Sequence, residues 1–139
     1  VKAVHLVPGT DLAFLLIDPP VNLFSVPLAD MEDIVKGTNV YTIGHSTMLK
    51  GTVMGGKLTG VQREKIDGVA RVTALRLNFE MEKGDSGSPI LNAQGKLLGI
   101  VGAGTIGPGN VTIAIPSNAI AAAFKEYRSK IGEQRTAKR

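Results

Sequence analysis

The sequence contains no cysteine and no tryptophan, and only two of its 139 residues are histidine. Without cysteine, the chain can form no disulfide bond, no thiol nucleophile and no cysteine-ligated zinc site. This absence argues against a disulfide-bonded secreted protein. It favours an intracellular location, in a viral or host cytoplasm, or a bacterial envelope.

Long apolar runs are also absent. No stretch approaches the roughly 20 consecutive apolar residues that span a bilayer as a helix, so we expect no membrane insertion. The composition is otherwise that of a globular domain, with 43% hydrophobic residues, 20% charged residues and 17 glycines. A chain of this length makes one ordinary domain or part of a large all-β domain.

The net charge of +4 is concentrated at one end of the chain. Residues 1–124 carry ten acidic and ten basic side chains, whereas residues 125–139 carry six basic and two acidic ones. Such a tail is typically a solvated chain end, and binding to RNA or another acidic surface is the alternative. No aromatic stacking platform accompanies the charge, which disfavours nucleic acid as a partner.

The most informative stretch is 80–104, EMEKGDSGSPILNAQGKLLGIVGAG. Two glycines flank Ser86, so the backbone can turn tightly and leave the serine hydroxyl exposed. Two apolar runs separated by a polar turn at 92–95 follow, and they predict a β-hairpin. A glycine-rich surface turn without chemistry is the alternative interpretation of the central tetrapeptide.

The whole pattern strongly resembles the nucleophile loop of chymotrypsin-like serine proteases: an acidic residue, Gly-Asp-Ser-Gly-x-Pro, a short turn, then Gly-x-Leu-x-Gly-Ile-Val-Gly. The resemblance implies that Ser86 is the nucleophile and that the N–H groups of Gly84 and Ser86 form the oxyanion hole. A serine hydroxyl is a weak nucleophile, so this chemistry needs an adjacent base and donors aimed at the oxyanion. No metal or cofactor is implied.

A second segment, Asp11-Leu-Ala-Phe-Leu-Leu-Ile, resembles the catalytic-aspartate segment of the same family. Such an aspartate holds the base histidine in one tautomer and stabilises its charged form. An aspartate in a turn before a strand is the alternative interpretation. Asp18 is a rival candidate, but it lies beside two prolines at the far end of the strand. The order of the two segments along the chain favours Asp11.

The resemblance also suggests how a substrate is bound. Gly102, Ala103 and Gly104 would line the substrate channel and pair their backbone with an extended polypeptide. In the trypsin-like pattern, the residue six positions before the nucleophile lies at the floor of the specificity pocket, which here is Glu80. A carboxylate there predicts cleavage after Lys or Arg. In the alternative, Glu80 points to solvent and pairs with Lys83.

The base is the missing part of the pattern, because His5 and His45 are the only histidines. The family order is histidine, aspartate, serine, with the histidine a few tens of residues ahead of the aspartate. His5 lies six positions before Asp11, and His45 lies between Asp11 and Ser86, so neither fits. We therefore expect a second polypeptide to complete the first barrel and supply the histidine.

These segments predict an all-β, chymotrypsin-like double β-barrel, with the second barrel complete and the first only partly present. The stretch VYTIGHSTMLKGTVMGGKLTGV resembles the opening of the second barrel in cysteine-free members, which include HtrA-type bacterial and RNA-virus proteases. We expect separate glycine-punctuated strands at 50–60 and from Val61 onward. The expected divisions are the last strands of the first barrel (1–26), an inter-barrel linker (27–37), the second barrel with the nucleophile loop (38–116), a C-terminal helix (117–131) and a basic tail (132–139).

The function predicted from the sequence is serine endopeptidase activity through an acyl-enzyme on Ser86. The chain would be the C-terminal part of a cleaved or polyprotein-derived protease. Two alternatives remain open: an inactive protease-fold module for binding or assembly, which the missing histidine supports, and a viral protein whose basic tail binds RNA.

Overall fold

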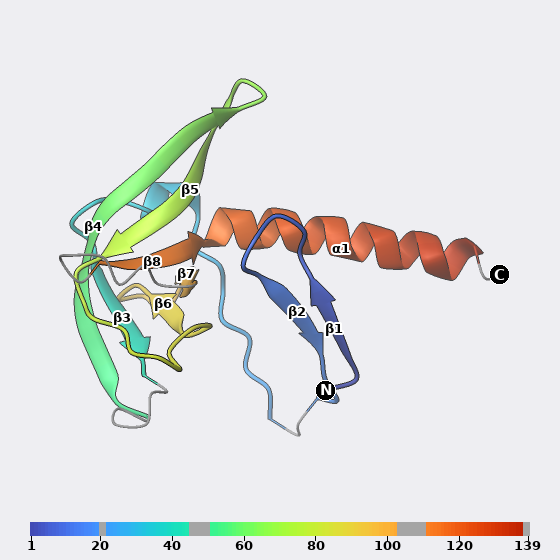
Figure 1. Cartoon of the computed structure of the whole chain (residues 1–139), viewed down its shortest axis with the longest axis horizontal. Coiled ribbons are helices and arrows are strands. Elements are labelled where there is room, and N and C mark those ends of the chain that lie inside the picture. Colours follow the sequence, from blue (N-terminus) through green and yellow to red (C-terminus); the bar gives the residue numbers. More distant parts are fainter. Residues whose placement is uncertain (20–21, 45–50, 103–110, 138–139) are drawn as a thin grey trace.

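The computed structural model describes residues 1–19, 22–44, 51–102 and 111–137, with side chains described as far as Ile131. Within these ranges the chain is mostly β-structure followed by one long helix (Figure 1). In chain order the elements are β1 (Ala3–Leu6), β2 (Ala13–Leu16), the 3₁₀ turn η1 (Met31–Asp33), β3 (Asn39–Ile43), β4 (Val53–Ile66), β5 (Val69–Leu77), β6 (Pro89–Leu91), β7 (Leu97–Val101), β8 (Thr112–Pro116) and α1 (Ser117–Ala137).

Strands β3 to β8 form a closed barrel in the order β3-β4-β5-β8-β7-β6, with antiparallel neighbours. Buried and exposed residues alternate along β3, as in a strand with one face on a core. Burying each large apolar side chain stabilises the fold by about 1.5–3 kcal/mol, so this interior dominates stability. The side chains that fill it without solvent exposure include Val40, Leu58, Leu75, Ile90 and Leu98. The all-β prediction and the complete second barrel are confirmed.

Strand β4 differs from the prediction of two strands divided near Gly60. It runs without interruption for 14 residues and pairs with β5, with register shifts between Leu58 and Gly60 and between Gln62 and Arg63. The glycine is accommodated inside the strand, where the Arg76 side chain covers the space that a Cβ would take. The far part of the β4–β5 hairpin projects beyond the barrel (Figure 1).

Strands β1 and β2 form a separate two-stranded sheet beside α1 (Figure 1). On one face, the cross-strand pair His5 and Phe14 contacts the helix: the His5 ring lies 4.5 Å from the Tyr127 ring, and the Phe14 ring lies 5.3 Å from that of Phe124. Successive residues of a strand alternate faces, so the opposite face carries Val4, Leu6 and Leu15. These three apolar side chains are 58–73% exposed.

The segment 27–37, predicted as a linker, is packed against the barrel. The Ala29 N–H donates to the Leu97 carbonyl at 2.9 Å, and the Leu97 N–H donates to the Pro27 carbonyl at 2.8 Å. Ile34 is fully buried, and Asp33 forms an ion pair with Lys96 at 3.1 Å. The crossing from the β1–β2 sheet to β3 is therefore held to the barrel by main-chain and side-chain contacts.

The C-terminal helix is longer than predicted. It begins at Ser117, whose hydroxyl donates to the Ala29 carbonyl at 2.9 Å, and continues to Ala137 instead of ending near Ile131. Most of the added residues are good helix formers, and Gly132 costs only about 1 kcal/mol relative to alanine, so nothing local stops the helix there. The predicted boundary between a helix ending at 131 and a separate tail beginning at 132 is wrong, because the helix continues to Ala137.

Candidate active site

The nucleophile loop leads into the β6–β7 hairpin, and β7 holds it in place. The N–H of Gly87 donates to the Val101 carbonyl at 2.8 Å, and the N–H of Val101 donates to the Ser88 carbonyl at 2.9 Å. Gly84 and Gly87 have φ values of 108° and 87°, which side-chain-bearing residues rarely adopt. Ser86 is exposed between them. The loop thus has the tight turn that the flanking glycines predicted.

Some backbone N–H groups of this loop donate hydrogen bonds within the chain and others do not. The amides of Asp85, Gly87 and Ser88 donate to carbonyls of the chain itself. Those of Gly84 and Ser86 have no acceptor within the described part of the chain. Two N–H groups near a serine hydroxyl are the arrangement that stabilises an oxyanion formed beside that serine.

A cavity of about 410 Å³ opens at this loop. Ile43, at the end of β3, joins the loop residues in its wall and supplies an apolar side chain beside the nucleophile. Sequence reasoning missed this residue, because its place at the cavity depends on how the barrel closes. The described residues that line the cavity are Ile43, Gly84, Ser86, Gly87, Ser88 and Pro89.

Asp11 lies in the turn between β1 and β2. The turn is closed by the Val7 N–H, which donates to the Leu12 carbonyl at 2.9 Å, and by the Thr10 hydroxyl, which donates to the Val7 carbonyl at 3.1 Å. Asp11 Oδ2 lies near Gly102, 3.8 Å from the place where a Cβ on that glycine would be. Gly102 directly follows Val101, the residue that bonds to the nucleophile loop. The structure therefore brings Asp11 and the Ser86 loop to the same end of β7.

Of the other predicted site residues, the structure describes Glu80 and His5. Ala103, Gly104 and His45 lie outside the described residues. Glu80 is exposed and is not among the described residues that line the cavity at Ser86. His5 is half-buried against Tyr127 on the face of the β1–β2 sheet that contacts α1.

The structure and the pattern of motifs agree with the comparison to known families. Residues 1–100 match the family described as "Trypsin-like peptidase domain". The chain belongs to this family.

Individual members of the family resemble the chain over most of its length. It is 30% identical over 117 residues to the periplasmic serine endoprotease DegP of Escherichia coli (strain K12), which covers 81% of this chain and 24% of the relative. It is 28% identical over 118 residues to a serine protease HtrA-like protein of Staphylococcus aureus (strain MRSA252), covering 76% of this chain and 15% of the relative. The chain thus spans about a quarter or less of these relatives.

Comparison with solved structures confirms the double-barrel fold. The HtrA-type protease AlgW, solved with a decapeptide, aligns with a TM-score of 0.70 at 27% identity, over 93% of this chain and 40% of that one. The active form of the Rv3671c protease from M. tuberculosis aligns with a TM-score of 0.61 at 18% identity, over 88% of this chain and 57% of that one. The second match is a likeness of fold alone.

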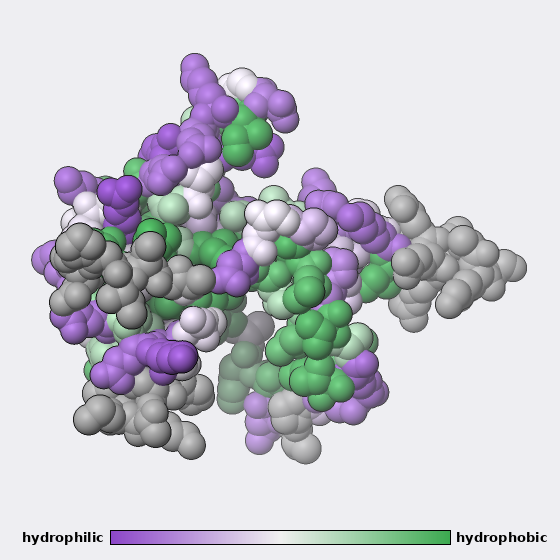
Figure 2. Space-filling view, in the orientation of Figure 1, coloured by the Kyte–Doolittle hydropathy of each residue, from purple (hydrophilic) through white to green (hydrophobic). Residues whose placement is uncertain are grey.

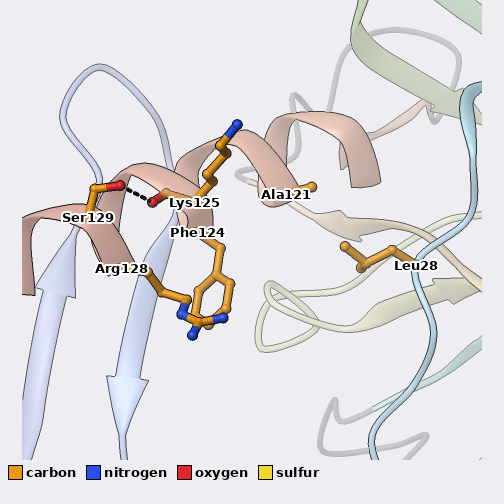
Figure 3. Close-up of a pocket in the computed structure, with 6 residues that line it drawn as sticks. All are labelled: Leu28, Ala121, Phe124, Lys125, Arg128 and Ser129. Atoms are coloured by element: carbon orange, nitrogen blue, oxygen red, sulfur yellow. Dashed lines mark hydrogen bonds between the residues drawn. The ribbon is translucent and has the colours of Figure 1, made fainter. Parts of the chain in front are cut away.

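A second cavity lies outside the nucleophile region. A cavity of about 460 Å³ lies between α1 and Leu28, where Phe124 and Arg128 extend from one side of the helix and Lys125 from the other (Figure 3). No helix in the described ranges is both long and apolar enough to cross a membrane. Across the same ranges, no three His, Cys, Asp or Glu residues lie close enough together to hold a metal ion.

Proposed function

We propose that this chain is the part of a serine endopeptidase that carries the nucleophile. The observation that carries the proposal is the exposed Ser86 on a tight, strand-anchored loop, beside two amides without an acceptor in the described structure. Membership in the trypsin-like peptidase family supports the same chemistry.

In the proposed reaction, Ser86 Oγ attacks the carbonyl carbon of a peptide bond while a histidine accepts the hydroxyl proton. The amides of Gly84 and Ser86 donate to the oxyanion of the tetrahedral intermediate. The C–N bond then breaks, the histidine returns the proton to the leaving amine, and an acyl-enzyme remains. Water attacks this ester in the same way and releases the second product.

Asp11 would orient the histidine and stabilise its charged form. Its place beside Gly102, at the end of β7 that holds the nucleophile loop, supports this role. His5 packs against Tyr127, and His45 follows Asp11 in the sequence, opposite to the family order, so we propose that the base comes from a segment outside this chain. That segment would be the amino-terminal piece of the same precursor or a second polypeptide.

The exposed face of the β1–β2 sheet supports a completing segment. Val4, Leu6 and Leu15 leave an apolar face open to solvent, and the sheet has two strands within the described residues. Apolar surface covers the β1–β2 region in Figure 2. Further strands of the first barrel would cover this face and pair with the open sheet edges.

The substrate would be a polypeptide bound in extended form along Gly102, Ala103 and Gly104. Glu80 would select a basic residue before the scissile bond. An inactive protease-fold module is the second candidate function, since His5, the histidine within the described residues, packs against Tyr127. RNA binding through the basic end of α1 is a third candidate, with no described contact to favour it.

Labelling with a serine-directed phosphonate tests the proposal on the chain assembled with its completing segment. The expected result is one modified peptide that contains Ser86, with no label in Ser86→Ala. Ser25→Ala is a matched control, because Ser25 is also exposed but lies far along the chain in the crossing segment. An assembled, folded protein that takes up no label at Ser86 would instead support the inactive module.

A further inference from the structure

The β1–β2 sheet, which carries Asp11 in its turn, is separate from the barrel that carries Ser86. Among the described residues, main-chain hydrogen bonds link β1 to β2 and close their turn, and none links either strand to a barrel strand. A two-stranded hairpin of this size is only marginally stable by itself. The position of Asp11 relative to Ser86 therefore depends on what the sheet packs against.

Helix α1 supplies this packing through two aromatic rings. Phe124 and Tyr127 lie three positions apart, so they share one side of the helix. The centre of the Tyr127 ring lies 4.5 Å from that of His5 and 5.6 Å from that of Phe14, and the Tyr127 and Phe14 rings are stacked at 26°. Phe124 meets Phe14 edge to face at 5.3 Å. These are the arrangements in which aromatic rings attract one another. Tyr127 thus contacts both strands of the sheet.

The two strand residues of this cluster lie close to the Asp11 turn. His5 and Phe14 form a cross-strand pair, and a single further pair separates them from the turn. The turn itself is closed by main-chain hydrogen bonds between its ends, so it moves together with its strands. A shift of the His5–Phe14 pair against Tyr127 would therefore carry Asp11 away from Gly102.

The amino-terminal end of α1 is fixed to the barrel. The helix follows β8 without a break, and the side-chain amide of Asn118 donates to the Val72 carbonyl of β5 at 3.0 Å. From there it extends past the β1–β2 sheet (Figure 1). About three helical turns separate this attachment from Tyr127. The helix is therefore an arm between the barrel that holds Ser86 and the sheet that holds Asp11.

We propose that Tyr127 is a positioning residue, which holds the β1–β2 turn so that the Asp11 carboxylate stays beside Gly102. Gly102 lies at the end of β7 that anchors the nucleophile loop, so this contact sets the distance from Asp11 to the Ser86 region. The docking of the rings is a property of the fold. Its consequence for turnover rests on the proposed protease function.

Kinetics of the assembled protease test the consequence. Tyr127→Ala is expected to lower kcat about 10²-fold, the loss that a displacement of about 1 Å in a catalytic geometry can cause. KM is expected to stay within about threefold, because neither strand of the sheet lines the described cavity at Ser86. Tyr127→Phe keeps the ring and is expected to retain kcat within about twofold. Arg128→Ala, at the next position of the helix, is the control.

The same substitution in an Asp11→Asn background separates positioning from a general loss of structure. Asp11→Asn alone is expected to lower kcat about 10⁴-fold. Because Tyr127 acts through the Asp11 carboxylate, adding Tyr127→Ala should then lower kcat by less than about threefold. An equal loss in both backgrounds would overturn the proposal, and so would a Tyr127→Ala variant with the parent kcat.

Amide hydrogen exchange of the assembled protein tests the docking without any catalytic measurement. The Val7 amide, which bonds across the Asp11 turn, is expected to exchange at least about tenfold faster in Tyr127→Ala and at the parent rate in Tyr127→Phe. The Leu97 amide, bonded to Pro27, is the internal reference and should not change. Unchanged exchange of Val7 in Tyr127→Ala would overturn the proposal. Faster exchange in an assembled protein that cleaves no peptide would support the docking and contradict the proposed function alone.

Discussion

The Asp11 carboxylate lies beside Gly102, although the two residues lie far apart in the sequence, and this places the β1–β2 turn next to the end of β7. A Cβ on Gly102 would lie 3.8 Å from Asp11 Oδ2 and 3.6 Å from Ile115 Cγ1, both ordinary van der Waals distances. The glycine therefore leaves room for a methyl group. A larger side chain is expected to press on the Asp11 carboxylate, because Asp11 Oδ2 is already in contact distance of that Cβ position.

We accordingly expect Gly102→Ala to fold normally, with a change in unfolding free energy below about 1 kcal/mol. Gly102→Val is expected to lower phosphonate labelling of Ser86, because the added methyl groups push Asp11 away. Gly99→Ala is the contrasting control: a Cβ at Gly99 would overlap the Ile115 carbonyl oxygen and should destabilise the fold by about 1–3 kcal/mol. Thermal unfolding and phosphonate labelling of the three variants test these predictions. Equal losses of stability in Gly102→Ala and Gly99→Ala would contradict them.

Ser86→Ala is expected to abolish peptide cleavage and to leave the fold unchanged. Loss of the nucleophile in such sites typically lowers kcat by about 10⁶. The side chain is exposed, so its removal creates no cavity. Cleavage of a peptide library and circular dichroism of the same sample check both statements. Near-parent turnover by this variant would remove the enzymatic role from Ser86.

The open face of the β1–β2 sheet predicts that residues 1–139 expressed alone are poorly soluble and that the completing segment rescues them. The double variant Leu6→Thr, Leu15→Thr should improve solubility of the chain alone and weaken its association with the segment, because both side chains are more than half exposed. Sedimentation and co-purification measure the two effects. A soluble, fully active monomer of the unmodified chain would refute the prediction and return His5 and His45 to consideration.

The ion pair between Asp33 and Lys96 predicts a pH dependence of stability. The hydrogen bond from Lys96 holds the pKa of Asp33 below its usual value, and Asp33 raises the pKa of Lys96. A lowered folded-state pKa stabilises the fold above the unfolded value of about 3.9, and this contribution is lost as the pH falls through the folded pKa. The Lys96 contribution is lost at the other end, as the pH rises through its raised pKa.

We therefore expect the unfolding temperature of Asp33→Asn to fall below that of the parent near neutral pH and to converge with it in acid. Both side chains are partly exposed, so the difference should be small and should shrink in high salt. Thermal melts from acid to neutral pH measure it. A difference that grows toward low pH would have the wrong sign for this ion pair.

Glu80 predicts cleavage after Lys or Arg, and Glu80→Gln should reduce that preference by removing the carboxylate partner of the basic side chain. A peptide-library profile of the assembled protease compares the two forms. Because Glu80 is not among the described residues of the cavity at Ser86, Ile43→Ala is an informative companion variant. Cleavage mainly after apolar or acidic residues, unchanged in Glu80→Gln but altered in Ile43→Ala, would assign selectivity to Ile43 instead.

Local features of the chain could be predicted from the sequence because a few neighbouring residues determine them. The nucleophile turn depends on Gly84 and Gly87, which take backbone angles that other residues avoid. The β6–β7 hairpin follows from two apolar runs around a turn in which Asn92 Oδ1 accepts the N–H groups of Gln94 and Lys96 at 3.0 and 2.9 Å. Family resemblance added the expected roles of Ser86 and Asp11, which remain proposals.

Other features depend on contacts between residues far apart in the chain. The pattern of residues within one short segment carries little information about such contacts. Closure of the barrel brings Ile43 to the cavity beside Ser86, and it lets β4 continue through Gly60 because β5 supplies its hydrogen bonds. The docking of α1 against Phe14 and His5 turns one face of the β1–β2 sheet inward. Sequence by itself determined local elements such as the nucleophile turn and the β6–β7 hairpin. Only the tertiary structure decided which of them meet, because barrel closure and helix packing set the distances between segments that the sequence keeps apart.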